Sequence, residues 1–133
     1  MAITSGLDHL GLSVNDLDQT VGFFVECLKW TESGRDPSYP RSAVSDGKIR
    51  LTLWQVDQSL NIGPFHRRKN IGLHHLALQV DSKHQLEVLA GEISQYPGVE
   101  IEFLPELVGD GPRMHMMFAE PGGIRLELIW SGT

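Results

Sequence analysis

The sequence predicts an α+β fold of two βαβββ modules that form a curved mixed sheet around a cup-shaped site. The main observation is an internal repeat. Residues 6–14 match residues 72–80 at six of nine positions, and residues 49–54 match residues 124–129 at four of six. Both pairs occur in the same order along the chain, which indicates a duplication. Within each copy, apolar residues first alternate and then recur at helical spacing, as expected for a strand followed by a helix.

The first module covers about residues 5–56. A strand is predicted over residues 7–14, where apolar residues occupy alternate positions. Asn15 or Asp16 can cap the following helix, whose apolar residues recur at helical spacing: Leu17, Val21, Phe24 and Leu28. Three short strands complete the module, and a turn at residues 46–48 joins the last two.

The second module covers about residues 71–131 and repeats this order. Its strand is predicted over residues 73–80, and its helix begins at Ser82, three residues before Gln85, which is the spacing of a capping box. A turn at residues 120–123 joins the last two strands. Residues 57–70 form a linker that is too short to separate independent domains, so a single domain is predicted for residues 1–133.

Composition excludes several classes of partner. Eleven Lys and Arg residues against 17 Asp and Glu residues give a net charge of −6, which disfavours nucleic acid. No apolar run reaches the ~20 residues that would cross a membrane. The single cysteine, Cys27, cannot form an internal disulfide, so a cytoplasmic protein is expected.

Strand alternation predicts a shared face for three potential metal ligands. His9, His75 and Glu127 each lie on the strand face opposite the apolar core residues of their module. They converge if the two sheets curve into a common cup. Two imidazoles and one carboxylate suit Fe, Ni, Co, Zn or Mn and leave coordination positions open. The alternative is that all three are ordinary polar residues on a solvated sheet face.

His115 is a further candidate, in the strand that precedes the strand of Glu127. Alternation along residues 113–118 leaves open whether His115 or its neighbours face the cup. His115 either supports the site, as an acid–base group or a partner of a metal ligand, or is a packed or exposed strand residue.

The paired modules and their motifs resemble the vicinal oxygen chelate superfamily. The motifs are LDHLGLSV at residues 7–14, LHHLAL at residues 73–78 and EPGGIRLEL at residues 120–128. This superfamily includes glyoxalase I, bleomycin-resistance proteins, fosfomycin-resistance transferases, methylmalonyl-CoA epimerase and extradiol dioxygenases. The resemblance covers about residues 5–131.

The resemblance implies four metal-ligand positions, which fall on His9, Thr52, His75 and Glu127. Thr52 departs from the pattern, because glyoxalase I is expected to carry Glu or Gln there. A Thr hydroxyl is a poor metal ligand and cannot act as a base. Gln55 has the opposite strand parity from Thr52, so it can replace Thr52 only across a bulge. The resemblance therefore implies a site of two histidines and one carboxylate.

The function implied by the resemblance is that of a metal-dependent lyase of the glyoxalase I type. Its divalent metal (Ni, Zn, Co, Mn or Fe) stabilises an enediolate, Glu127 is the catalytic base, and glutathione or another thiol can be a cosubstrate. The alternatives are an extradiol-type dioxygenase, a fosfomycin-resistance-type thiol transferase, or a bleomycin-resistance-like binding protein that is not an enzyme. A small-molecule substrate and a homodimer are expected.

Overall fold

The computed structural model describes residues 1–133, which form two compact units, residues 1–62 and residues 63–133. The boundary lies inside the predicted linker. Each unit contains a four-stranded mixed sheet with one helical segment, so the predicted α+β class and the βαβββ order are confirmed. The single domain over residues 1–133 and the cup between the sheets stay predictions.

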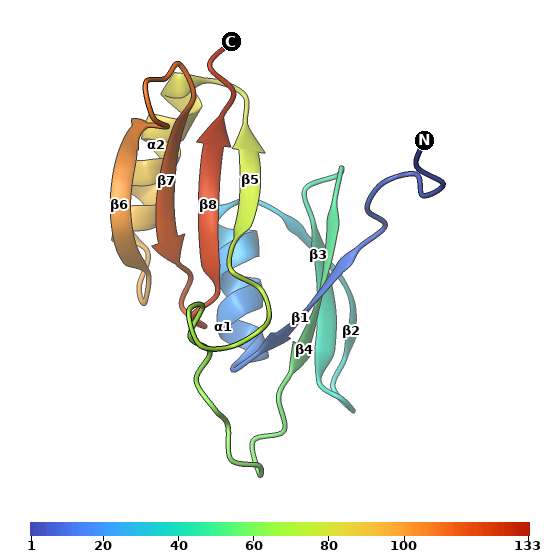
Figure 1. The fold of residues 1–133 in the computed structure, drawn as a ribbon. Helices are drawn as coiled ribbons and strands as arrows, with labels where there is room; N and C mark the ends of the chain where they lie inside the picture. The colour runs from blue at the N-terminus through green and yellow to red at the C-terminus, as the bar shows by residue number, and fades with distance from the viewer. The chain divides into compact units, whose positions relative to one another are not determined.

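The first sheet has the strand order β1-β4-β3-β2. Its strands β1 and β4 are parallel and the other neighbours are antiparallel. The strands are β1 (Leu10–Val14), β2 (Thr31–Asp36), β3 (Arg41–Ser45) and β4 (Arg50–Gln55). They are labelled in Figure 1. Helix α1 (Leu17–Gly22) continues into a π-helical turn, η1 (Phe23–Cys27), and packs against β3 and β4.

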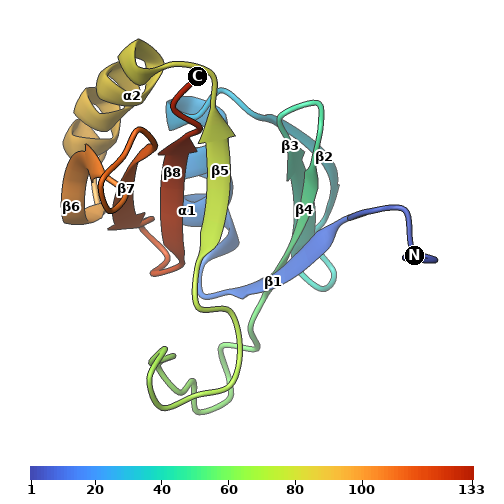
Figure 2. The same ribbon diagram turned by 45° about the horizontal axis from the view of Figure 1, so that its top comes forward.

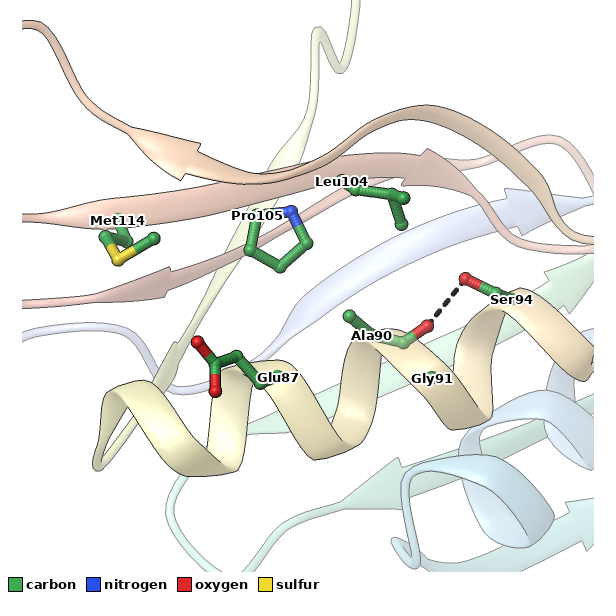
Figure 3. A pocket seen from close by; sticks show the side chains of 7 residues that line it. All are labelled: Glu87, Ala90, Gly91, Ser94, Leu104, Pro105 and Met114. Carbon is green, nitrogen blue, oxygen red and sulfur yellow. Dashed lines mark hydrogen bonds between the residues drawn. The ribbon is translucent and has the colours of Figure 1, made fainter.

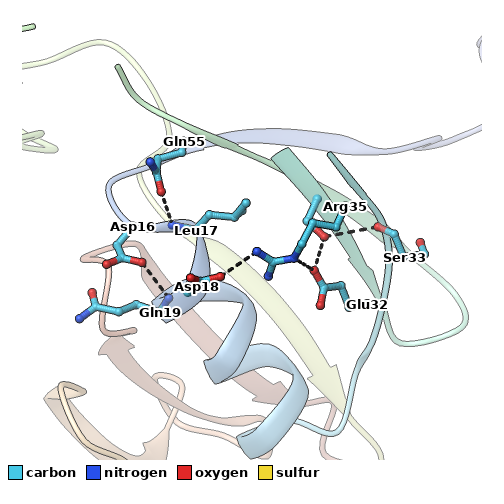
Figure 4. A network of polar contacts seen from close by, with 9 residues as sticks. Asp16, Leu17, Asp18, Gln19, Glu32, Ser33, Arg35 and Gln55 are labelled. Carbon is cyan, nitrogen blue, oxygen red and sulfur yellow. Dashed lines mark hydrogen bonds and ion pairs between the residues drawn. The ribbon is translucent and has the colours of Figure 1, made fainter. Parts of the chain in front are cut away.

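Side-chain hydrogen bonds fix the start of α1, as predicted. The Asp16 carboxylate accepts a hydrogen bond from the Gln19 amide, which identifies Asp16 as the N-cap residue (Figure 4). Gln55, at the end of β4, accepts a hydrogen bond from the Leu17 amide at 2.9 Å. Arg35 of β2 donates to Asp18 of α1 at 2.7 Å. These contacts tie the helix to its own sheet.

The second sheet has the order β5-β8-β7-β6, with the same pattern of parallel and antiparallel neighbours. Its strands are β5 (Leu76–Val80), β6 (Glu100–Leu107), β7 (Met114–Ala119) and β8 (Arg125–Trp130). Helix α2 (Lys83–Gln95), capped by Ser82 as predicted, lies along one face of this sheet (Figures 1 and 2). No helix of the chain is long and apolar enough to span a membrane.

Burial confirms the predicted alternation in the opening strands. Leu12 and Val14 of β1 are buried, as are Leu78 and Val80 of β5, whereas the residues between them are exposed. Both strands begin three residues later than predicted. His9 and His75 therefore lie immediately before their strands.

Strand β6 contains an irregularity that sequence alternation did not predict. Ile101 pairs with Phe118 and Phe103 pairs with Met117, so two steps along β6 match one step along β7. Glu102 is the additional residue of this bulge. A bulge re-aims side chains, and here it allows Glu102 and Phe103, although adjacent, to contact residues on the same face of the sheet.

Candidate functional site

Three titratable side chains meet on the face of the second sheet that α2 does not cover. Glu127, which is only 8% exposed, lies at the centre of this cluster. Its Oε2 is 2.5 Å from His115 Nδ1, and its Oε1 is 3.3 Å from His75 Nε2. A carboxylate only accepts hydrogen bonds, so His115 donates from Nδ1 and its Nε2 is left unprotonated in the neutral ring.

Strand register explains why these residues meet. Glu127 in β8 lies opposite Ala77 in β5 and Met117 in β7. His75 lies two residues before Ala77, and His115 lies two residues before Met117, so both share the face of Glu127. Both are diagonal neighbours of Glu127, within reach of its side chain. The structure thus brings His75 and Glu127 together on one face of this sheet, and their role as metal ligands stays a prediction.

His115 is the residue whose role the sequence left open. Its ring packs against Phe103 with a centroid separation of 4.8 Å, and 19% of its side chain remains exposed. The signal in the sequence was its parity with Met117, which lies opposite Glu127. That signal becomes decisive only once the register of β7 and β8 is known.

The separation of His75 and Glu127 fits two neighbouring ligands of one metal ion. Bonds of about 2.1 Å in tetrahedral or octahedral geometry separate adjacent ligand atoms by about 3.0–3.4 Å. The 3.3 Å between His75 Nε2 and Glu127 Oε1 lies in this range and is long for a hydrogen bond. The hydrogen bond from His115 to Glu127 resembles the outer contacts that orient metal-binding carboxylates.

A third ligand is not supplied by this cluster. No group of three or more His, Cys, Asp or Glu side chains in the chain is arranged to hold a metal ion. His9 lies in the first unit, where its Nδ1 contacts Asp8 Oδ1 at 2.7 Å. Its participation with His75 and Glu127 stays a prediction.

Thr52 has a structural contact in the first unit. Its side chain is buried, and Oγ1 accepts a hydrogen bond from Trp54 Nε1 at 2.9 Å. Thr52 lies beside Gly11 of β1. A side chain at position 11 would crowd the hydroxyl, because its Cβ would lie 3.2 Å from Thr52 Oγ1. The β4 ladders show no bulge, so Gln55 keeps the opposite parity and does not replace Thr52.

Charged residues surround the cluster. Arg125 holds Glu102 through two hydrogen bonds of 2.9 and 2.7 Å, and this pairing lowers the pKa of the Glu102 carboxyl and raises that of the guanidinium. Desolvation, together with the positive charge of Arg125, lowers the pKa of His74. His74 is therefore neutral near pH 7.

The cleft between α2 and the strands β6 and β7 is separate from this cluster. It has a volume of about 380 Å³ and contains one titratable side chain, Glu87 (Figure 3). Ser94 is engaged with the carbonyl of Ala90 at 2.6 Å. The other residues that line it are Gly91, Leu104, Pro105 and Met114. The cleft offers no group suited to acid–base or metal chemistry beyond Glu87.

The chain thus consists of two βαβββ units with the same strand order, and the second unit carries a cluster of two histidines and one glutamate on its sheet. The sequence profile of the Glyoxalase/Bleomycin resistance protein/Dioxygenase superfamily matches residues 6–128. The chain belongs to this superfamily.

Individual relatives are consistent with this assignment. The chain is 28% identical to a 2-epi-5-epi-valiolone epimerase from Actinomyces sp over an alignment of 148 residues, which covers 91% of this chain and 76% of the epimerase. A glyoxylase/bleomycin resistance protein/dioxygenase domain from Frankia sp. EAN1pec is 25% identical, with a TM-score of 0.78 and coverage of 96% and 98%. Lactoylglutathione lyase from Agrobacterium tumefaciens is 16% identical, with a TM-score of 0.73 and coverage of 98% and 97%, which shows a shared fold.

Proposed function

We propose that the chain is a metal-dependent enzyme of this superfamily that removes a proton next to a carbonyl group of a small-molecule substrate. The observation that carries the proposal is the cluster of His75, Glu127 and His115. The distance between His75 Nε2 and Glu127 Oε1 suits two ligands of one metal ion. His115, beside them, is a histidine that could accept and release a proton.

His75 and Glu127 would hold the metal, with His9 as the third ligand. Each histidine has an acceptor or partner at Nδ1, which leaves Nε2 for coordination. A bound divalent ion (Ni, Zn, Co, Mn or Fe) would supply the positive charge that stabilises the enediolate oxygens of the substrate. Thr52 would take no part, because its hydroxyl is buried against Trp54.

His115 and Glu127 would act together on the substrate proton. The Glu127 carboxylate accepts the hydrogen bond from His115 Nδ1, so the unprotonated Nε2 would be available as a base. When Nε2 takes up the proton, the adjacent carboxylate stabilises the imidazolium that forms. Glu127 would thus contribute to catalysis as a metal ligand and as the partner of His115, and the base would be His115 rather than the Glu127 predicted from the sequence.

The epimerase relative favours this reaction over the alternatives. It is an epimerase by name, and epimerisation next to a carbonyl begins with removal of a proton. A lyase of the glyoxalase I type, with glutathione or another thiol as cosubstrate, uses the same first step. The set of two histidines and one carboxylate equally suits iron and dioxygen, which keeps an extradiol-type dioxygenase as the second candidate.

The first test is the metal content of the full chain, purified without chelator or nickel resin and measured by elemental mass spectrometry. We expect about one ion per chain, lost in His75→Ala. The matched control is His84→Ala, which removes an exposed histidine of α2 and should retain the metal. Iron as the bound metal would favour the dioxygenase. No metal, even after each ion is supplied, would overturn both enzymes and leave a binding protein of the bleomycin-resistance type.

A second test addresses the proton transfer itself. A panel of small 2-hydroxyketones would be incubated with the protein in D₂O, and exchange of the hydrogen next to the carbonyl would be followed by NMR. We expect metal-dependent exchange that is lost in His115→Phe. Size-exclusion chromatography with light scattering on the same samples tests the homodimer, which we propose as the assembled form.

A further inference from the structure

A chain of polar contacts leads to His75 from the side away from Glu127. Arg125, held by the two hydrogen bonds to Glu102, approaches His74 with Nη1 3.2 Å from Nδ1. His74 Nδ1 in turn lies 2.7 Å from His75 Nδ1. None of these four residues except His75 was assigned a role in the site.

Hydrogen-bond chemistry sets the direction of this chain. A guanidinium carries donors only, so His74 Nδ1 must be the acceptor in its contact with Arg125. A nitrogen that accepts there has no proton to give to His75. The 2.7 Å contact between the two rings therefore runs from His75 Nδ1–H to the single lone pair of His74 Nδ1, which Arg125 approaches at the longer distance of 3.2 Å.

The consequence appears at the other nitrogen of His75. A neutral imidazole carries one proton, so Nε2 keeps its lone pair and directs it toward Glu127 Oε1, 3.3 Å away. A lone pair and a carboxylate repel each other unless a cation lies between them. The arrangement is thus prepared for a positive ion and not for a hydrogen bond between His75 and Glu127.

Two features of the second sheet place Arg125 for this role. The strand β7 lies between β8 and β6, and its residue opposite Arg125 is Ala119, whose small side chain leaves room for the guanidinium to cross. The bulge in β6 turns the Glu102 carboxylate toward the guanidinium of Arg125. The bidentate contact then fixes the orientation of Arg125.

In the first unit, a single hydrogen bond fixes the tautomer of His9. Asp8 takes the position of His74 in the repeat, and its carboxylate accepts directly from His9 Nδ1 at 2.7 Å. His9 is therefore also protonated at Nδ1 and has a free Nε2. A histidine that donates from one nitrogen to a carboxylate and coordinates through the other is the usual arrangement at metal sites. In the second unit, an imidazole replaces the carboxylate.

We propose that Arg125 and His74 are positioning residues that hold His75 in the Nδ1-protonated tautomer, so that Nε2 is ready to bind a metal ion. The inference rests on the proposed metal site for its purpose. The tautomer itself exists in the metal-free protein and can be measured there.

The experiment compares wild type with His74→Phe and His74→Asp in the full, metal-free chain. Two-bond ¹H–¹⁵N correlation spectra distinguish the two neutral tautomers of His75 at a pH of about 8. We expect Nδ1–H in wild type, a shift toward Nε2–H in His74→Phe, and return of Nδ1–H in His74→Asp, which copies Asp8. His84→Phe is the matched control and should leave the spectrum of His75 unchanged.

Zinc affinity, measured by competition with a chromophoric chelator, supplies the second readout. We expect His74→Phe to weaken binding by about 10–100-fold and His74→Asp to restore it to within a few-fold. An Nε2–H tautomer in wild type, or a His74→Phe protein with wild-type tautomer and affinity, would overturn the inference. Absence of zinc binding to wild type would instead overturn the proposed function, and the spectra alone would then decide the tautomer.

Discussion

Thr52 and Glu127 occupy the same place in the two units: each is the third residue of the central strand that runs parallel to the opening strand. Their diagonal neighbours also correspond, because Arg41 lies opposite Trp54 as His115 lies opposite Ile129. In the first unit, these positions carry a hydroxyl and a guanidinium. In the second unit, they carry a carboxylate and an imidazole, which are joined by a hydrogen bond.

The comparison shows how one backbone can support two kinds of polar contact. In the first unit, the Trp54 indole donates to Thr52, and its ring packs against Tyr39 and below Arg41. In the second unit, Ile129 stands where Trp54 stands and has no hydrogen-bonding side chain. Glu127 is therefore available to His75 and His115. Thr52 is thus held in a structural contact with Trp54, whereas Glu127 contacts two histidines.

The largest expected effect comes from making the second unit resemble the first. Glu127→Thr would replace the proposed carboxylate ligand with a hydroxyl, which is a poor ligand for a divalent metal. We expect the metal content to fall below about a tenth of the wild-type value, since even the loss of an outer contact costs about 10–100-fold. Elemental mass spectrometry measures this. A variant that kept its metal would remove Glu127 from the site.

A smaller effect is expected from His115→Phe. The ring would still pack against Phe103, but the donor to Glu127 would be lost. We expect zinc affinity to fall by about 10–100-fold. Thermal stability should fall as well, because the loss of a donor to the buried Glu127 carboxylate costs about 1–3 kcal/mol. Chelator competition and thermal unfolding measure the two quantities, with His84→Phe as the control. Wild-type affinity would show that His115 does not orient Glu127.

Thr52→Val tests the structural assignment of Thr52. The change leaves the Trp54 indole N–H without its acceptor in a partly buried place, which costs about 1–3 kcal/mol of unfolding free energy. Urea denaturation measures the loss, and Thr52→Ser, which keeps the hydroxyl, should show less than half of it. We expect the metal content to remain that of wild type. A loss of metal in Thr52→Val would instead assign Thr52 to the site.

The smallest expected effect is a change in the pKa of two carboxyl groups, those of Asp8 and Glu102. The hydrogen bond from His9 lowers the pKa of Asp8 below its ordinary 3.8, and the hydrogen bonds from Arg125 lower that of Glu102 below 4.5. Carbon-detected NMR titration should show Asp8 returning toward 3.8 in His9→Ala and Glu102 returning toward 4.5 in Arg125→Ala. Unchanged values would contradict these pairings.

The sign of the pH effect follows from the direction of the Glu102 shift. A carboxyl group whose pKa is lowered by folding stabilises the folded state above its unfolded pKa. For Glu102, that contribution is present above about pH 4.5 and is lost as the pH falls through the lower, folded value. The Arg125→Ala variant should therefore lose stability relative to wild type at pH 7 and less so at low pH.

The sequence by itself determined the order of elements and the faces of the strands. The repeat, the caps at Asp16 and Ser82, and the alternation of apolar residues are local properties, because each depends on neighbours within one turn or one strand. Local patterns also sufficed to place His75 and Glu127 on one face of the sheet.

Only the tertiary structure decided which side chains meet across strands. The register of β7 against β8 brings His115 to Glu127, and the bulge at Glu102 turns its carboxylate to Arg125. Register and bulges depend on pairing between segments far apart in the chain, and a shift of one residue would reverse every face. For that reason the sequence predicted the candidate ligands, whereas the tertiary structure was needed to identify the side chains that contact them.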